Sequence, residues 1–365
     1  MFLSRTVSGY LGRNFAVWFA IVLATLFAVF ALIDIVELLR RSAGKPLVTL
    51  AIIADMELLR LPNLLQEAVP FAVLFGGMFA FVKLTRHHEL IVLRAAGVSV
   101  WQFLLPALLI ATTVGAIKVM ALNPLAAVLL AHYERMEGRY LSGKSALLAV
   151  ANSGLWLREV DANGNHTVVA AKAVRPDQVT LDEATFYVFE GEDQFLRRID
   201  ARTARLEPGH WLIEEAIVRS PQSAYRPVAV VRLPTDLTTD KIQESFASPK
   251  TVSFWHLPRF IRVLEETGFS ATPHRLRWHA LMAEPLLLMA MVLLAATFSL
   301  RLQRRGGTLL LVGTGVLAGF LLHVMTNVIH ALGIGASVPV VLAAWAPAGV
   351  SLMAGLSLLL HLEDG

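Results

Sequence analysis

The sequence predicts an α-helical membrane protein with six transmembrane helices and an inserted all-β domain. Of its 365 residues, 56% are hydrophobic and only 16% are charged, and the mean hydropathy is +0.60. A typical soluble domain has about 25% charged residues. Most of the acidic residues lie between positions 123 and 273, where no apolar run is long enough to cross a bilayer. We therefore expect transmembrane helices in residues 1–122, an extramembrane β domain in 123–273 and further transmembrane helices in 274–365.

The composition also excludes several classes of protein. The chain has no cysteine, which excludes a disulfide scaffold, a thiolate metal site and a cysteine nucleophile. Lysine and arginine number 32 against 28 aspartate and glutamate residues, a net charge of +4. Such a small excess does not indicate nucleic acid as a partner.

The first half of the chain predicts three spans. Residues 14–33 contain no charged side chain, and about 20 residues suffice to cross a hydrocarbon core of ~30 Å. Asp34 and Glu37 follow in place of a small-residue cleavage site, so we expect this segment to be retained as a helix. Lys118 is expected to extend its side chain towards the membrane surface. The second and third spans are predicted at about 62–82 and 100–122.

The middle region has the pattern of strands joined by tight turns. Asn163-Gly164 separates GLWLREV from TVVAAKAV and predicts a β-hairpin, because this dipeptide readily adopts the positive φ angles of a type I′ turn. The segments FYVFEGEDQFLRRI and ARLEPGHWLIEEAIV repeat the alternation of apolar and polar residues. We expect a sandwich-like β module, followed by an amphipathic helix over 253–268 with Ser253 as its N-cap.

The second half of the chain predicts three more spans. The fourth covers about 278–300 and ends at the basic run RLQRRGG, after which no aspartate, glutamate, lysine or arginine occurs before Glu363. This stretch is too long for one span. The turn-like LGIGASVP at 332–339 divides it into the fifth and sixth spans.

The basic residues of the short loops predict the orientation. The loops after the second and fourth spans are basic, whereas the loop between the fifth and sixth has no cation, so we place both termini in the cytoplasm and the β domain on the opposite side. The loop after the first span breaks this rule, which suggests a function for its cations. The residues concerned are Lys83, Arg86 and Arg94 after the second span, Arg301, Arg304 and Arg305 after the fourth, and Arg40, Arg41, Lys45 and Arg60 after the first.

No motif supports catalysis by this chain. Residues 138–145, GRYLSGKS, match the nucleotide-binding expression G-x-x-x-x-G-K-[ST], but a charged helical stretch precedes them where a P-loop needs a buried strand. His323 and His330 share one helical face, which is compatible with metal binding or proton relay but also with ordinary helix packing. Glu284 is expected to pair with a nearby basic residue; the candidates are Arg275, Arg277 and His279. We expect no catalytic residue, no metal and no cofactor.

Residues 85–99, TRHHELIVLRAAGVS, predict a short amphipathic helix over 85–97 that Gly97 ends as a C-cap. One interpretation is a helix that lies on the lipid surface. The other is a docking helix for a cytoplasmic motor subunit, in which Glu89 presents a carboxylate and Leu90 and Leu93 an apolar stripe.

The stretch RHHELIVLRAAG resembles the coupling helix of the LptF/LptG permeases of the lipopolysaccharide transport ABC system, which carries a similar R-x-E-L-x-V-x-x-A-x-G pattern. The resemblance covers nearly the whole chain, including the order of spans and β domain and the segments LPNLLQEAVPFAVLFGGMFAF and GIGASVPVVLAAWAP. The loop after the fourth span and the GIGASVP hairpin look closer to the LptG branch.

The resemblance implies a permease subunit that extracts lipopolysaccharide from the inner membrane of a Gram-negative bacterium. It would pair with an LptF-type permease and an LptB-type ATPase dimer that hydrolyses ATP. Lipopolysaccharide would enter laterally past the first and fifth spans. The β domain, a jelly roll in the family, would pass it to a periplasmic bridge of LptC-type and LptA-type proteins.

The resemblance also assigns roles to individual residues. The positions implied for contact with the ATPase are Arg86, Glu89, Leu90, Leu93 and Gly97. Arg40 and Arg41 match basic positions that meet the phosphates of the glycolipid, and Arg135 matches a basic position near a tyrosine beyond the third span. Asp34 is a fourth position implied for the substrate, although it departs from the pattern, because some members have a basic substrate contact there.

Other functions remain open at this point. The chain could be a permease for another lipid or a lipoprotein, or a membrane-anchored scaffold whose β domain binds a periplasmic partner. An anchor, however, needs no docking helix with Glu89. An integral ATPase that uses residues 138–145 would require the inverted topology, which the cytoplasmic loop cations disfavour.

Overall fold

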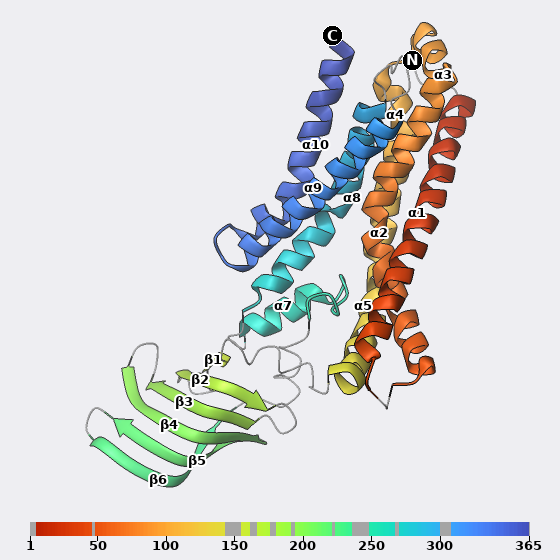
Figure 1. Cartoon of the computed structure of the whole chain (residues 1–365). Helices are drawn as coiled ribbons and strands as arrows, with labels where there is room; N and C mark the ends of the chain where they lie inside the picture. Colours follow the sequence, from red (N-terminus) through yellow and green to blue (C-terminus); the bar gives the residue numbers. More distant parts are fainter. Residues whose placement is uncertain are drawn as a thin grey trace.

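The computed structural model describes residues 5–45, 48–142, 155–160, 166–175, 180–190, 194–220, 223–235, 248–266, 270–299 and 308–364. The long helices form an elongated bundle, a β sheet lies beyond one end of it, and both ends of the chain lie at the other end (Figure 1). The helices before the sheet are α1 (Arg5–Ser42), α2 (Leu50–Arg86), α3 (Glu89–Ala95), α4 (Val100–Ile117), η1 (Lys118–Leu122), α5 (Asn123–Met136) and η2 (Glu137–Ser142). Those after it are α7 (Leu257–Glu266), α8 (Thr272–Ser299), α9 (Thr308–Ile334) and α10 (Val340–Asp364).

The predicted fold class is confirmed. Within the described residues, six helical stretches are long and apolar enough to cross a membrane: α1, α2, the run from α4 to Leu141, α8, α9 and α10. A turn between Ile334 and Val340 separates the last two, where GIGASVP predicted it.

The second helix begins well before the predicted start of its span. It starts at Leu50 instead of residue 62, and the Thr49 hydroxyl caps it by accepting a hydrogen bond from the Ile52 N–H at 3.4 Å. Pro62 and Pro70 both lie inside the helix. Prolines are tolerated inside membrane helices where neighbouring groups compensate for the lost hydrogen bonds.

The third span is also longer than predicted. From Val100 to Leu141 the helix is continuous for 42 residues and includes the π-helical segments η1 and η2. The predicted start of the β domain at 123 therefore falls inside a helix. Asn123 is buried there, and its Oδ1 accepts a hydrogen bond from the Phe254 N–H at 2.9 Å. From the sequence, this polar residue suggested a loop. In the structure its side chain has a hydrogen-bond partner in the segment that leads from the sheet back to the bundle.

Small residues allow the helices to pack closely. A Cβ atom at Gly76 would lie 2.7 Å from Cα of Phe19, so the backbones of α1 and α2 touch. A Cβ atom at Gly115 would lie 2.7 Å from Cα of Pro285 in α8. Such close approaches through glycine are typical of membrane helix interfaces.

Among the described residues, the sheet contains six antiparallel strands in chain order. They are β1 (Leu155–Val160), β2 (His166–Arg175), β3 (Thr180–Glu190), β4 (Gln194–Glu207), β5 (His210–Ser220) and β6 (Ser223–Pro234). One face is apolar and includes Phe186 and Trp211, whose rings pack edge to face with centroids 5.9 Å apart. β1 pairs with β2 from Val160 opposite His166; the turn predicted at Asn163-Gly164 between them lies outside the described residues.

The amphipathic helix α7 lies between the sheet and the bundle (Figure 1). It begins at Leu257, and the Ser253 carbonyl accepts hydrogen bonds from the N–H groups of His256 and Leu257, both at 3.0 Å. Its apolar side chains Leu257, Ile261 and Leu264 are buried. The helix predicted over 253–268 is therefore present but shorter.

Two helices contribute little to the core. In the most apolar 18-residue window only 11% of residues are buried in α1 and in α9, compared with 61% in α2 and in α8. The apolar surface of α1 and α9 is thus left to lipid or to another protein.

Candidate functional site

The helix α3 lies at the end of the bundle away from the sheet (Figure 1). The predicted helix over 85–97 is in fact divided: α2 continues through Arg86, and α3 begins at Glu89 after a turn in which His88 has a φ of 59°. Gly97 has a φ of 80°. Its N–H donates to the Arg94 carbonyl and the Val98 N–H donates to the Leu93 carbonyl, at 2.9 and 3.1 Å. This is a Schellman motif, so the predicted end of the helix at Gly97 is observed.

The side chains of α3 are distributed differently from the predicted apolar stripe. Leu90 is buried in the bundle core, and Leu93 is partly buried against the same core. The apolar side chains on the open surface are Ile91, 49% exposed, and Val92, 67% exposed. A partner that binds this surface would therefore contact Ile91 and Val92, while Leu90 and Leu93 attach α3 to the bundle.

Glu89 is connected to the first span. The Tyr10 hydroxyl in α1 donates a hydrogen bond to Glu89 Oε1 at 3.1 Å. Glu89 also occupies the first turn of α3, where a carboxylate is favoured by the helix dipole. The carboxylate therefore has a fixed position at the open end of the bundle.

A second group of polar residues, which we call the outer cluster, lies where α1, α2, α5 and η2 meet at their ends nearest the sheet. Its members are Asp34, Arg41, Glu57, Arg60, Tyr133 and Glu137.

Arg60 is at the centre of the outer cluster. Its NH1 atom forms an ion pair with Asp34 Oδ1 at 2.6 Å and donates to the Tyr133 hydroxyl at 3.4 Å. The guanidinium carbon also lies 5.3 Å from the centroid of the Tyr133 ring. Glu57 is buried beside Asp34, and Arg41 is paired with Glu137. The cluster thus joins the sheet-proximal ends of three spans through charge.

The four residues that the sequence assigned to substrate occupy different positions. Asp34 is 7% exposed and faces Arg60, so it lies behind the surface. Arg41 belongs to the outer cluster. Arg40 is exposed and forms two hydrogen bonds to Glu37, at 2.7 and 2.8 Å. Arg135 is exposed, and its Nε donates to the Ala131 carbonyl at 3.2 Å.

The central member of this cluster, Arg60, was not predicted as part of a site. The sequence placed it in a loop, because the second span was predicted to begin at about residue 62. The spacing of three residues between Glu57 and Arg60, with Pro62 read as tolerated inside a span, is the signal that could have placed Arg60 on a helix. No local signal indicates its partners Asp34 and Tyr133, which are distant in the chain.

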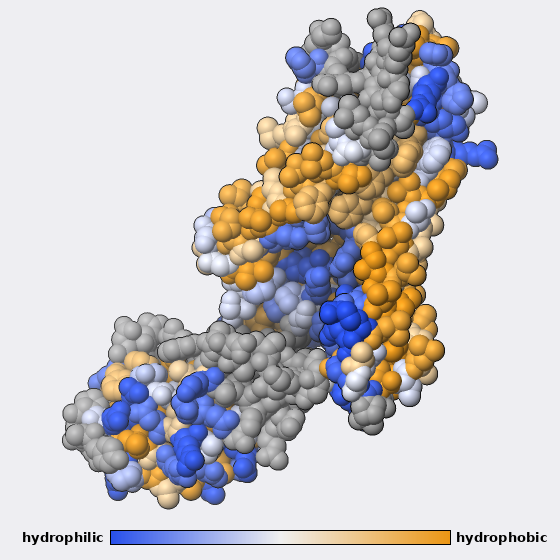
Figure 2. All heavy atoms as spheres, viewed as in Figure 1, coloured by the Kyte–Doolittle hydropathy of each residue, from blue (hydrophilic) through white to orange (hydrophobic). Residues whose placement is uncertain are grey.

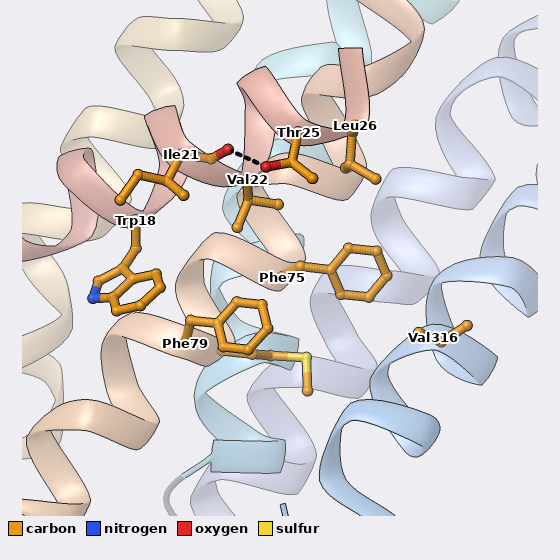
Figure 3. Close-up of a pocket in the computed structure, with 9 residues that line it drawn as sticks. Trp18, Ile21, Val22, Thr25, Leu26, Phe75, Phe79 and Val316 are labelled. Carbon is orange, nitrogen blue, oxygen red and sulfur yellow. Dashed lines mark hydrogen bonds between the residues drawn. The ribbon is translucent and has the colours of Figure 1, made fainter. Parts of the chain in front are cut away.

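An apolar pocket of about 310 Å³ lies farther along the bundle, between α1, α2 and α9 (Figure 3). The Thr25 hydroxyl donates a hydrogen bond to the Ile21 carbonyl at 2.9 Å, so it is already engaged within α1. A pocket of this kind suits a hydrocarbon chain. The lining residues are Trp18, Ile21, Val22, Thr25, Leu26, Phe75, Met78, Phe79 and Val316.

Two polar residues within the spans, Lys118 and Glu284, have other partners than the sequence predicted. Lys118 does not extend to the membrane surface: it is 7% exposed and forms an ion pair with Glu284 of α8. Glu284 is therefore not paired with Arg275, Arg277 or His279, as the sequence suggested. Arg275 pairs instead with Glu265.

The two histidines of α9 have separate environments. His323 Nε2 lies 3.0 Å from Asn327 Nδ2, and its ring lies 5.7 Å from that of Phe71. His330 instead lies near Arg277 and Glu284. In the part of the chain that the structure describes, no group of three or more histidine, aspartate or glutamate residues could hold a metal ion.

The residues that match the nucleotide-binding motif begin in a helical segment. Residues 138–142 belong to η2, which continues α5, and residues 143–145 lie outside the described ones. No strand precedes the motif within the described stretch from Val100 to Ser142, so the geometry of a P-loop is not formed there.

Comparison with known proteins identifies relatives whose similarity covers nearly the whole chain. A family model described as "Lipopolysaccharide export system permease LptF/LptG" matches residues 9–361. The lipopolysaccharide export system permease protein LptG of Haemophilus influenzae is 24% identical over 358 residues, which cover 94% of this chain and 95% of the relative. The protein of the same name from Escherichia coli strain K12 is 24% identical over 368 residues, which cover 96% and 97%.

Proposed function

Because the chain belongs to the LptF/LptG family of lipopolysaccharide export system permeases, we propose that it is one of two permease subunits of a transporter that extracts lipopolysaccharide from the inner membrane. The chain itself would form part of the route of the lipid and would not hydrolyse ATP. ATP hydrolysis is assigned to a separate LptB-type ATPase dimer.

The observation that carries this proposal is the distribution of side chains along α1. Its end nearest the sheet carries Arg40 and the outer-cluster residue Arg41. Farther along the helix, side chains between Trp18 and Leu26 on one face line the apolar pocket. From Leu26 to Arg40 is fourteen residues, or about 21 Å at ~1.5 Å per residue. One helix therefore presents cations and, deeper in the membrane, an apolar pocket, which matches a phosphorylated glycolipid with acyl chains.

The two helices with the least buried surface border this pocket. α1 and α9 contribute to its walls while most of their remaining apolar residues are exposed. We assign lateral entry of lipopolysaccharide to this side, with α1 and α9 as the moving gates. Their exposed surfaces would also face the second, LptF-type permease.

We assign the end of the bundle that carries α3 to the cytoplasm, together with both termini (Figure 1). The ATPase would contact Glu89, Ile91 and Val92, and its motion would reach the bundle core through Leu90. The β domain would then lie in the periplasm, where it hands lipopolysaccharide to LptC-type and LptA-type proteins. We retain residues 1–122, 123–273 and 274–365 as functional regions, although the third span, from α4 to η2, continues past 122.

Charge reversal at the outer end of α1 tests the proposed path. Replacing Arg40 and Arg41 together with glutamate is expected to reduce photocrosslinking of lipopolysaccharide to this end of the transporter about tenfold, since charge-assisted bonds to phosphate are lost. The matched control is Arg202→Glu, an exposed arginine paired with Glu215 in the β domain. Equal crosslinking in the double variant and the wild type would remove these arginines from the path.

A further inference from the structure

A third group of charged residues lies deeper in the bundle than the outer cluster. We call it the inner cluster; it consists of Glu67 in α2, Lys118 in η1, Arg277 and Glu284 in α8 and His330 in α9. Glu67 is seven residues beyond Arg60 on α2, which places it about 10 Å farther from the sheet at ~1.5 Å per residue. Ionisable groups at such depth are costly unless they are paired or serve a function.

The carboxylates of the inner cluster are already engaged. Glu284 is paired with Lys118, and both side chains are largely buried. Glu67 Oε1 accepts a hydrogen bond from Asn63 Nδ2 at 3.0 Å and lies 3.5 Å from Lys250 Nζ. Lys118 and Lys250 therefore take up the two carboxylates of the inner cluster.

Arg277 is the cation left over. Its Nε atom is buried without a hydrogen-bond partner, and no carboxylate of the described residues lies within ion-pair distance of its guanidinium group. Glu284 and Glu67 act on it electrostatically from farther away, and His330 lies close on α9. A guanidinium group offers a planar set of donors that fits a phosphoryl group in two-pronged geometry.

Hydrophilic and apolar surfaces lie close together on one side of the bundle (Figure 2). Figure 2 shows hydrophilic side chains gathered in a hollow between the apolar surfaces of the two sides of the bundle, on the side of the sheet. Arg277 comes from α8 and His330 from α9, which also borders the apolar pocket through Val316. An anionic group near Arg277 could thus belong to a molecule whose apolar part lies between α1 and α9.

We propose that Arg277 is a second binding position for a phosphoryl group of the transported glycolipid, deeper than the arginines at the end of α1. This inference rests on the proposed function. It assigns recognition of a second phosphate to a residue of α8. A glycolipid with two phosphates would then contact the arginines at the end of α1 with one phosphate and Arg277 with the other.

The test measures binding of three lipids to the purified transporter with all its subunits. The probes are bisphosphorylated lipid A, its monophosphorylated form and phosphatidylglycerol. The wild type is expected to bind the bisphosphorylated form about tenfold more tightly than the monophosphorylated one. Arg277→Gln should abolish this ratio, and Arg277→Lys should retain part of it. Arg275→Gln, which alters the exposed partner of Glu265, should leave the ratio unchanged.

The outcomes separate this inference from the proposed function. An unchanged ratio in Arg277→Gln, with weakened binding in the Arg40→Glu, Arg41→Glu variant, would overturn the inference alone. Absence of lipid A binding in the wild type would instead overturn the proposed function. Equal dependence of phosphatidylglycerol binding on Arg277 would overturn the assignment to the transported glycolipid. Partial retention of the ratio in Arg277→Lys shows that a loss in the glutamine variant reflects charge and not misfolding.

Discussion

Replacing Glu89 with lysine is expected to reduce ATP-driven release of lipopolysaccharide by at least tenfold. Removing one member of a charged pair at an interface costs about 2–5 kcal/mol, and charge reversal adds repulsion. The fold should persist, because Glu89 is only partly buried and its side chain accepts one hydrogen bond within the described residues, from Tyr10. The measurement compares ATPase recovery and lipopolysaccharide release for wild-type and variant complexes.

Two further variants sharpen this experiment. Glu89→Gln keeps an acceptor for the Tyr10 hydroxyl but removes the charge, so it should resemble the lysine variant more than the wild type. Glu215→Lys makes the same reversal on an exposed strand residue, 68% exposed, and should have no effect. Transport at the wild-type rate in Glu89→Lys would show that α3 is an interfacial helix and not a docking helix.

Replacing Lys118 with methionine is expected to lower the free energy of unfolding by about 3–5 kcal/mol, because it leaves the Glu284 carboxylate without its cation inside the bundle. The ion pair joins η1 to α8, with side-chain exposures of 8% and 15%. Thermal unfolding of the detergent-solubilised chain measures the effect.

The double variant Lys118→Met, Glu284→Met separates the ion pair from the packing of the side chains. Replacing both members of a buried pair with apolar residues is often nearly neutral, so the double variant should unfold close to the wild-type temperature. Arg202→Met, which breaks an exposed pair, should have little effect. A single variant as stable as the wild type would show that the pair does not stabilise the bundle.

The sequence predicts the number of spans well, since apolar run length is a local property that the bilayer thickness limits. It predicts helix ends poorly. α2 includes Arg60 and Pro62, and the third span includes Asn123, because contacts with neighbouring segments satisfy residues that would otherwise end a span. The hairpin pattern of the β domain is again local, and its strands are observed in chain order.

The polar sites depend on contacts that no local pattern contains. Lys118 and Glu284 are separated by 166 positions, and Arg60 and Tyr133 by 73. The sequence indicated that such residues are unusual for a membrane span but not which of them meet. Likewise, the helical pattern of α3 gives its apolar residues, whereas the bundle decides that Leu90 is buried and Val92 is exposed.

We propose that this chain is half of a permease driven by a separate ATPase. The most direct measurement is purification of the tagged chain from its native membrane in mild detergent, with identification of the bound subunits by mass spectrometry and assay of ATP hydrolysis. We predict recovery of an ABC ATPase and a second six-span permease, with hydrolysis that depends on both. Recovery of a stable chain alone, without ATPase activity, would contradict the claim and favour a membrane-anchored periplasmic scaffold.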